Sequence, residues 1–190
     1  MNYFKEDYNG SLIHKRFGYN FFKKEYNPLG VIIAFRGKMD VTDNLIDLED
    51  KLNNDYIYSE DALNFCWEIP NVCPIGAVFF QRLFANEIGK HLTNKIYGDL
   101  IVDVRGDDIM VKQPTDLDFG KASVSITKII ENNVAVGHLG LNIKAGNKAP
   151  SFAFSLNLDE DKTDHLAKNI KDLFYEMMQD NFIATTKVVI

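Results

Sequence analysis

Polar and apolar residues alternate through the middle of the chain, between residues 121 and 143, as they do in strands that bury one face. One face of the first stretch carries polar side chains, namely Lys121, Ser123, Ser125 and Thr127. In the second stretch, His138 and Asn142 share a face, while Leu139 and Leu141 take the opposite one. We therefore predict two strands that pair as an antiparallel hairpin.

The turn of this hairpin is predicted at Asn132 and Asn133, because asparagine tolerates the positive φ angles that tight turns require. A two-residue turn would pair Thr127 with His138 and bring the polar side chains of both strands to one face. A three-residue turn would instead put Lys121 on the side of the apolar residues. We therefore predict the two-residue turn and one shared polar face.

Shorter patterns predict the remaining elements. Residues 31–35 are apolar and β-branched, which is typical of a strand buried on both faces, and the segment that ends this strand carries Arg36 and Lys38. Further strands are predicted at 3–8, 100–105, 109–111, 152–158 and 183–190. Helices are predicted at 43–53, 59–69, 74–91 and from 159 onward, where capping residues precede apolar residues at helical spacing.

The helix predicted at 74–91 is expected at the centre of the core. It begins at Pro74, and one broad apolar side of it carries Ile75, Phe79, Leu83 and Ile88. The helix predicted from residue 159 is expected to pack its own apolar residues inward, namely Leu166, Ile170, Leu173, Phe174, Met177 and Met178.

Length and composition fit one globular domain that spans residues 1–190. The apolar share of 46% is too high for disorder, and charged residues interrupt it too often for a membrane span. The N-terminus has no basic patch followed by an apolar core, so a cytoplasmic protein is expected. Cys66 and Cys73 are expected to be reduced, and no metal site is predicted.

The formal net charge of -6 disfavours binding to nucleic acid, because the basic residues are dispersed among acidic ones. A small or cationic partner is easier to accommodate. Phosphate-binding loops of the GxxxxGKS or GxGxxG kind are absent from the sequence, and the histidines have no Ser or Cys at the spacing of a catalytic triad.

The predicted polar face has two interpretations. It is a solvated sheet face, or it is a concave small-molecule site that Gly140 lets a ligand approach closely. In the second interpretation the ligand is surrounded by Lys121, Ser123, Ser125, His138 and Asn142.

An acidic pair, Asp107 and Asp108, lies in a predicted turn just after Arg105. Paired carboxylates beside a cation could hold a magnesium ion or orient a substrate amine. The other interpretation is an ordinary acidic turn.

Eight segments of the chain resemble an uncharacterised archaeal and bacterial family, the domain of unknown function numbered three hundred and sixty-six. They are YNGSLI (8–13), FRGKMDV (35–41), IDLED (46–50), IYSEDALNF (57–65), RGDDIMV (105–111), KASVSIT (121–127), HLGLNI (138–143) and ATTKV (184–188). The match covers nearly the whole chain but implies no activity.

A second resemblance is to biotin protein ligases, in which a WPNDI-like segment precedes a KxxGIL strand and an IGLNV strand. RGDDI, GKASVSI and LGLNI follow in the same order here, and HLGLNI is also similar to HGLALNV of lipoyl transferases. This alignment puts Asp108 in the place of the WPND aspartate and Asn142 in that of the asparagine. It puts Lys121 in the place of the lysine near the carboxylate and phosphate of the acyl-adenylate.

This second resemblance implies an α+β fold like the class II synthetase and biotin or lipoate ligase core, with a mainly antiparallel mixed sheet and long helices on one face. Two features differ. Val124 replaces the glycine of KxxG, and Arg36-Gly37-Lys38 is a reduced counterpart of the GRGRRGR loop that clamps the adenylate.

The expected function is a small-molecule enzyme or binding protein related to ligases and acyltransferases, with a carboxylate or nucleotide ligand. The candidate catalytic residues are Lys121, His138 and Asp108. Lys121 would neutralise the negative charge of the ligand, and His138 would carry a proton. The other expected ligand contacts are Arg36, Lys38, Arg105, Ser123, Ser125 and Asn142. The cofactor stays open, with ATP and magnesium as a candidate, and a homo-oligomer is expected. The alternative is a non-catalytic interaction or regulatory protein that keeps a ligase-like core.

Overall fold

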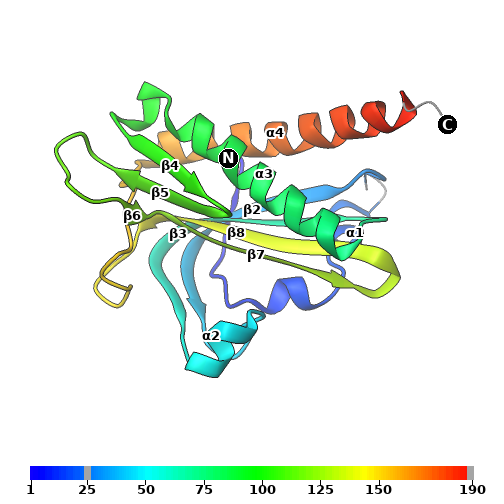
Figure 1. The fold of residues 1–190 in the computed structure, drawn as a ribbon, viewed down its shortest axis with the longest axis horizontal. Helices are drawn as coiled ribbons and strands as arrows, with labels where there is room; N and C mark the ends of the chain where they lie inside the picture. The colour runs from blue at the N-terminus through cyan, green and yellow to red at the C-terminus, as the bar shows by residue number, and fades with distance from the viewer. Residues whose placement is uncertain (24–26, 188–190) are drawn as a thin grey trace.

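The chain forms a five-stranded sheet, a smaller three-stranded sheet and two long helices, as the computed structural model of residues 1–23 and 27–187 describes it (Figure 1). The strand order of the larger sheet is β1-β2-β3-β8-β7, and its pairs are antiparallel except that β1 runs parallel to β2. Its strands are β1 (Phe4–Lys5), β2 (Val31–Val41), β3 (Ile57–Ile69), β7 (Ser123–Ile130) and β8 (Val134–Lys144). The predicted α+β fold with a mainly antiparallel mixed sheet is confirmed.

The three-stranded sheet packs beside β7. It contains β4 (Ile101–Arg105), β5 (Asp108–Lys112) and β6 (Gly120–Lys121), and β4 and β5 are joined by the predicted turn. Ala122 separates β6 from β7. Its N–H donates to Ile109 O in β5 and its carbonyl accepts from Asn142 N in β8, both at 2.8 Å. The chain therefore leaves the small sheet and enters the large one at a single residue.

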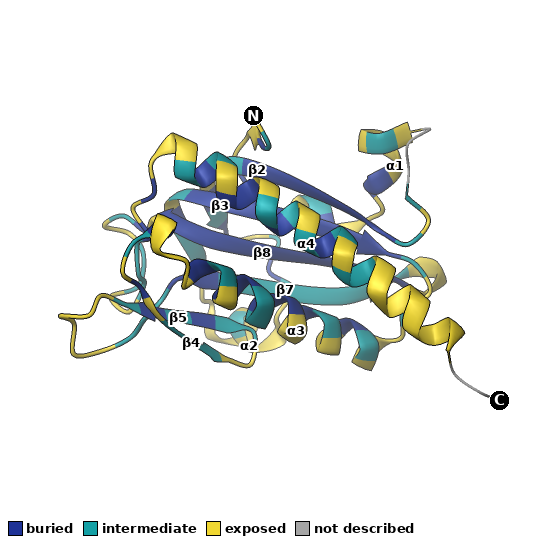
Figure 2. Ribbon diagram, turned by 90° about the horizontal axis from the view of Figure 1, so that it is seen from above, coloured by how far each residue is buried: buried dark blue, intermediate teal, exposed yellow. Residues whose placement is uncertain are grey.

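The helices α3 (Pro74–Leu92) and α4 (Glu160–Thr186) both cover one face of the large sheet, as predicted (Figure 2). Asp159 caps α4, because its side chain accepts a hydrogen bond of 2.8 Å from Lys162 N. Beneath the helices lies an aromatic cluster in which Trp67 contacts Phe84 and Phe84 contacts Phe174. Of the predicted inward residues of α4, Leu166, Ile170 and Phe174 are buried.

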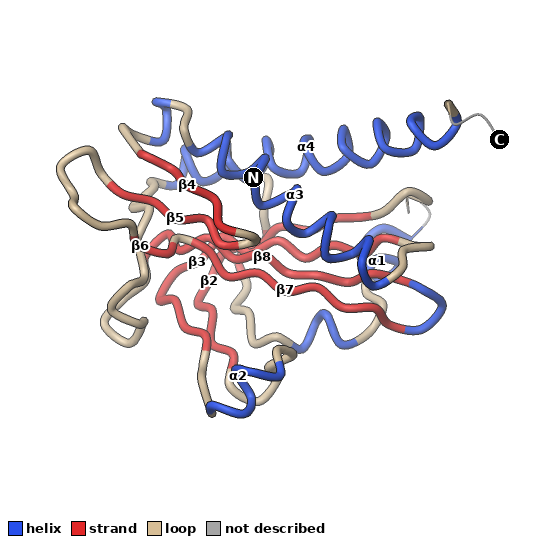
Figure 3. The backbone as a smooth tube through the Cα atoms, viewed as in Figure 1, coloured by secondary structure: helices blue, strands red, loops and turns tan. Residues whose placement is uncertain are grey.

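The opposite face of the sheet is covered by the N-terminal segment and by the connection between β2 and β3. Tyr8, Ile13 and Phe17 are buried there against Ile33 and Phe35. The short helices on this side are η1 (Ser11–His14), α1 (Gly18–Phe22) and α2 (Leu48–Asn53), while η3 (Lys95–Tyr97) follows α3 and η4 (Glu131–Asn133) joins β7 to β8. Figure 3 shows α2 on the side of the sheet away from α3 and α4.

The helix predicted at 59–69 is wrong, because this segment is the central strand β3. Leu63 and Trp67 face the long helices and Cys66 faces the other layer. A strand buried on both faces has no polar side, so its apolar residues match a helical spacing by chance.

The predicted span of α3 is confirmed to within one residue, but its predicted inner face is only partly right. Ile88 is buried as predicted, whereas Ile75, Phe79 and Leu83 are exposed and Ala77 and Ala85 are buried in their place. Small residues let α3 approach β4 closely, because a Cβ added to Gly89 of α3 would lie only 2.5 Å from Cγ2 of Val104 in β4.

Four further predictions change. The strand predicted at 152–158 is a loop with one bridge from Ala153 to Lys121, although Leu156 and Leu158 are buried. The helix predicted at 43–53 starts at Leu48, and the strand predicted at 3–8 is two residues long. The tail predicted as a strand continues α4 to Thr186, and residues 188–190 lie outside the described part of the chain.

Candidate functional site

A cavity of about 520 Å³ lies on the face of the large sheet opposite the long helices. Its floor includes His138 and Asn142 of β8 and Val124 and Ile126 of β7. The connection between β2 and β3, with α2, forms one wall, and the start of β5 with β6 forms another. The size is in the range of about 300–1,000 Å³ that is typical of small-molecule sites.

The hairpin register at the floor differs from the prediction. Its turn has three residues, so Ile130 pairs with Val134 and Ile126 pairs with His138. The two asparagines do have positive φ, 61° at Asn132 and 56° at Asn133. The shared polar face is therefore wrong: Ser123 and Ser125 point to the same face as Leu141 and Leu139.

The serines tolerate that face because the small sheet and α3 supply their hydrogen-bond partners. Ser123 Oγ accepts from Ile109 N at 2.9 Å. Ser125 Oγ donates to Asp107 Oδ2 at 2.9 Å and accepts from Gln81 Nε2 at 2.7 Å. Since β7 is the edge strand of its sheet, the cavity borders on both of its faces, and both serines still line it.

Lys121 and Asp108 form an ion pair at the cavity wall, with 2.7 Å between Nζ and Oδ1. Asp108 begins β5, and Lys121 lies in β6, not in the strand of the serines as predicted. Both side chains are partly exposed, at 29% for Lys121 and 37% for Asp108, so a ligand can reach them. Lys121 is the one Lys or Arg that lines the cavity within the described residues.

Asn142 has one satisfied and one unsatisfied polar atom. Its Nδ2 donates to Lys121 O at 3.3 Å, whereas its Oδ1 is buried and has no hydrogen-bond partner within residues 1–23 and 27–187. A buried acceptor left unpaired costs about 1–3 kcal/mol. The residue is only 4% exposed and lines the cavity, so a donor in that cavity, from a water or a bound molecule, would satisfy its oxygen.

His138 is a neutral ring at the floor. Asn64 Nδ2 donates to Ala62 O, so Asn64 Oδ1 accepts, and the 2.9 Å contact with His138 Nε2 puts the ring proton on Nε2. The ring stacks on Tyr8 with centroids 3.8 Å apart. Burial lowers the pKa of His138 to about 3, so Nδ1 keeps its lone pair at neutral pH.

Apart from Lys121, the charged residues of the lining in the described chain are all acidic, and the sequence reasoning missed them except for Asp107 and Asp108. Asp47, Asp50 and Asp55 all come from α2 and its flanks. Burial raises the pKa of Asp50, and the negative charges of Asp47 and Asp55 raise it further, while Lys121 opposes the shift. The signal in the sequence was the run of four acidic residues between positions 47 and 55, with Glu49 among the aspartates, a pattern that is usually a solvated surface.

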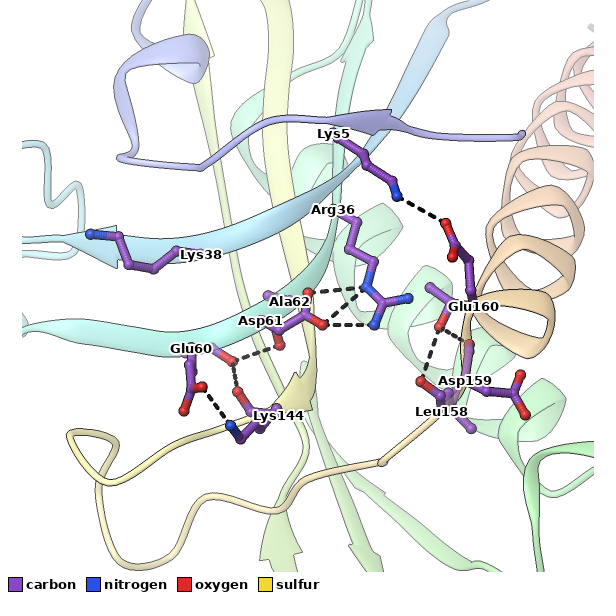
Figure 4. Close-up of polar contacts among 12 residues, drawn as sticks. Lys5, Arg36, Lys38, Glu60, Asp61, Ala62, Lys144, Leu158, Asp159 and Glu160 are labelled. Carbon is purple, nitrogen blue, oxygen red and sulfur yellow. Dashed lines mark hydrogen bonds and ion pairs between the residues drawn. The ribbon is translucent and has the colours of Figure 1, made fainter.

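Three predicted ligand contacts do not line this cavity. Figure 4 shows Arg36 held by Asp61 and Lys38 pointing away from that pair. Arg36 Nη2 lies 2.7 Å from Asp61 Oδ2, and Lys38 pairs with Asp40. Arg105 pairs with Asp103 at the exposed end of β4.

The space beside Gly140 does not admit a ligand as predicted, because Met39 occupies it. A Cβ on Gly140 would lie 2.9 Å from Met39 Sδ.

No group of three or more His, Cys, Asp or Glu side chains in the described part of the chain is placed to hold a metal ion. No helix among the same residues has the length and apolarity that a membrane crossing requires.

Solved structures with a similar fold include a protein of unknown function from Pyrococcus horikoshi. It has a TM-score of 0.78 and 24% identity, over 98% of this chain and 94% of that one. P. falciparum LipL1 in complex with lipoate has a TM-score of 0.53 and 15% identity, over 87% of this chain and 55% of that one.

A biotin acetyl coenzyme A carboxylase synthetase from Helicobacter pylori with bound biotinylated ATP has a TM-score of 0.48 and 13% identity, over 94% of this chain and 75% of that one. The chain thus has a fold similar to that of the P. horikoshi protein and of LipL1. No curated protein matches it in sequence. Residues 2–189 match the domain of unknown function DUF366, and the chain belongs to this family.

Proposed function

We propose that the protein binds a small organic molecule with a carboxylate group in the cavity described above, as an enzyme related to ligases and acyltransferases. The observation that carries this proposal is the partly exposed Lys121, the one cation of the lining in the described residues, near the apolar side chains of Val124 and Ile126 in the floor. A carboxylate of the ligand would either replace Asp108 as the partner of Lys121 or pair with Lys121 alongside Asp108. A neighbour of similar fold, LipL1, was crystallised with lipoate, which is a carboxylic acid.

The other groups of the lining support orientation of such a ligand. The Oδ1 atom of Asn142 and the Nδ1 lone pair of His138 accept hydrogen bonds, and Ser123 Oγ has a proton to donate. Val124 and Ile126 provide apolar contacts for the body of the molecule. His138 acts as an acceptor here, and as a proton carrier only through Nδ1.

The cavity does not fit the triphosphate of ATP. Phosphate groups require clustered cations or a glycine-rich cradle, and Lys121 is the one cation of the described lining. Arg36 and Lys38, the reduced counterpart of the adenylate clamp, are engaged elsewhere. The proposed function therefore includes no adenylation step.

The test is a binding screen that compares the protein with its Lys121→Ala variant. A ligand that binds the folded state raises the melting temperature by mass action, so a panel of small carboxylic acids identifies binders. Lys144→Ala is the matched control, because it also removes one ion-paired lysine but lies outside the cavity. Loss of binding in Lys121→Ala alone is expected, and unchanged binding in that variant would overturn the proposal.

The alternative function is a non-catalytic interaction protein. It is favoured by the exposed apolar side of α3, where Ile75, Phe79 and Leu83 have no cover within the described chain. Exposed apolar patches of this kind often mark contacts between proteins.

A further inference from the structure

Two carboxylates of the cavity have no ion-pair partner among the described residues, although the positive charge of Lys121 partly offsets the raised pKa of Asp50. Asp108 pairs with Lys121, and Asp107 accepts hydrogen bonds from Gln81 and Ser125. Asp50 and Asp55 have no ion pair and no side-chain hydrogen bond among the described residues.

Asp47 adds to this negative charge. Its side chain accepts from Glu49 N and Asp50 N at the start of α2, which fixes its carboxylate beside the other two. The raised pKa of Asp50 has burial as its first cause and the repulsion by Asp47 and Asp55 as the next two. A cation placed among these groups would relieve that repulsion.

A second observation comes from the opposite side of the cavity. Asn142 is 4% exposed, lines the same cavity and has no partner for its Oδ1 within the described residues. This atom accepts hydrogen bonds and cannot donate one. A hydrogen-bond donor with a positive charge would therefore suit both the acidic wall, because of its negative charge, and the floor, because of its unpaired acceptor.

We propose that the ligand of this cavity carries a protonated amine, which Asp50 and Asp55 neutralise and which adds a hydrogen-bond donor to an acceptor-rich lining. The carboxylate at Lys121 rests on the function proposed above. The amine and this carboxylate together define an amino acid or a related amino carboxylic acid. Five aspartates and one lysine in the lining give an excess of negative charge, so a ligand with a carboxylate alone should bind more weakly than one that also carries an amine. Biotin and lipoate are ligands with a carboxylate alone.

The experiment measures binding of matched compounds by calorimetry. Leucine is compared with 4-methylpentanoate, which lacks the amine, and with 3-methylbutylamine, which lacks the carboxylate. 6-Aminohexanoate is compared in the same way with hexanoate and pentylamine. Standard amino acids are screened by thermal shift beforehand, so that the matched set is extended to the side chain that binds best.

We expect the amino acid of a matched set to bind at least about tenfold more tightly than the acid without the amine. The double variant Asp50→Asn, Asp55→Asn should lose this difference. Asp43→Asn is the control, since it removes a charge from the same connection but lies outside the cavity. A folded Asp50→Asn, Asp55→Asn protein is verified by its unchanged circular dichroism.

The two proposals fail in different ways. If acids with and without the amine bind equally, and both depend on Lys121, the amine inference is overturned and the carboxylate site stands. If amines bind through Asp50 and Asp55 while Lys121→Ala has no effect, the carboxylate proposal is overturned and the amine site stands. If no amine or acid of the panel binds, both are overturned.

Discussion

His138 and Asn64 lie on the neighbouring strands β8 and β3 and are joined by a hydrogen bond of 2.9 Å between Nε2 and Oδ1. The nearly complete burial of the ring favours the neutral imidazole, because a charged ring would lose its hydration, and the bond holds the proton of this neutral ring on Nε2. Protonation of His138 is thereby coupled to unfolding.

The first prediction is a dependence of stability on pH. The pKa of His138 is about 3 in the folded chain against a usual value of 6.5. The contribution of the neutral ring to the free energy of unfolding is therefore complete above pH 6.5 and is lost as the pH falls toward 3. In this window His138→Gln should have a slope of unfolding free energy against pH that is smaller by about 1.4 kcal/mol per pH unit. Urea denaturation of both proteins at several pH values measures it. Parallel curves would contradict the buried neutral ring.

The second prediction is that Asp50→Asn stabilises the protein without ligand. The pKa of Asp50 is raised above its usual value of 3.8, so its favourable contribution is present below that pH and is lost as the pH rises through the raised value. At pH 7 we expect a gain of up to about 1 kcal/mol, since solvent screens part of the repulsion. The gain should vanish near pH 3. Asp43→Asn should leave the stability unchanged. An equal gain in that variant would contradict the conclusion that repulsion among the carboxylates of the cavity destabilises the protein.

The third prediction concerns the close approach of β8 to β3. A Cβ on Gly137 would lie 2.2 Å from Cζ2 of Trp67, a fully buried ring that cannot move aside. Gly137→Ala should therefore destabilise the fold by about 1–3 kcal/mol. Gly76→Ala in α3 is the contrast, because its added Cβ would be 3.3 Å from a Val72 methyl group and alanine favours a helix. Equal denaturation midpoints for the two variants would contradict this packing.

The fourth prediction tests the expected homo-oligomer through α3. Phe79 is 66% exposed, so Phe79→Ser should leave the fold intact. If a second copy covers this side of α3, the substitution should lower the mass measured by analytical ultracentrifugation. Leu48→Ser, at a position 70% exposed on α2, is the control. If the wild-type protein is a monomer, the exposed side of α3 does not mediate self-association.

The sequence predicted the elements that have a polar side and missed those that do not. α4 was recognised because Leu166, Ile170 and Phe174 recur on one side of a charged helix. β3 was not, because nearly all of its residues after Asp61 are buried and no alternation marks a strand. For α3 the span followed from Pro74, but the buried side depends on how closely small residues let it approach the sheet.

The candidate site was predicted in part for the same reason. Lys121, Asp108 and Asn142 were found from their segments, and the structure brings them to one cavity. The one-residue difference in the hairpin turn could not be foreseen, because it depends on partners in β5 and α3 for Ser123 and Ser125. The acids of α2 were missed because only tertiary packing places them opposite β7.

Ala122 connects the two halves of the ligand site mechanically. Its backbone is hydrogen-bonded on one side to Ile109 of the small sheet and on the other to Asn142 of the large one. Lys121 precedes it and Ser123 follows it, so a rotation of one sheet against the other must move the cation relative to the floor. The span between the charged groups of a bound molecule is therefore set by the angle between two sheets, which a substitution at the fully buried Ala122 would alter without touching the ligand.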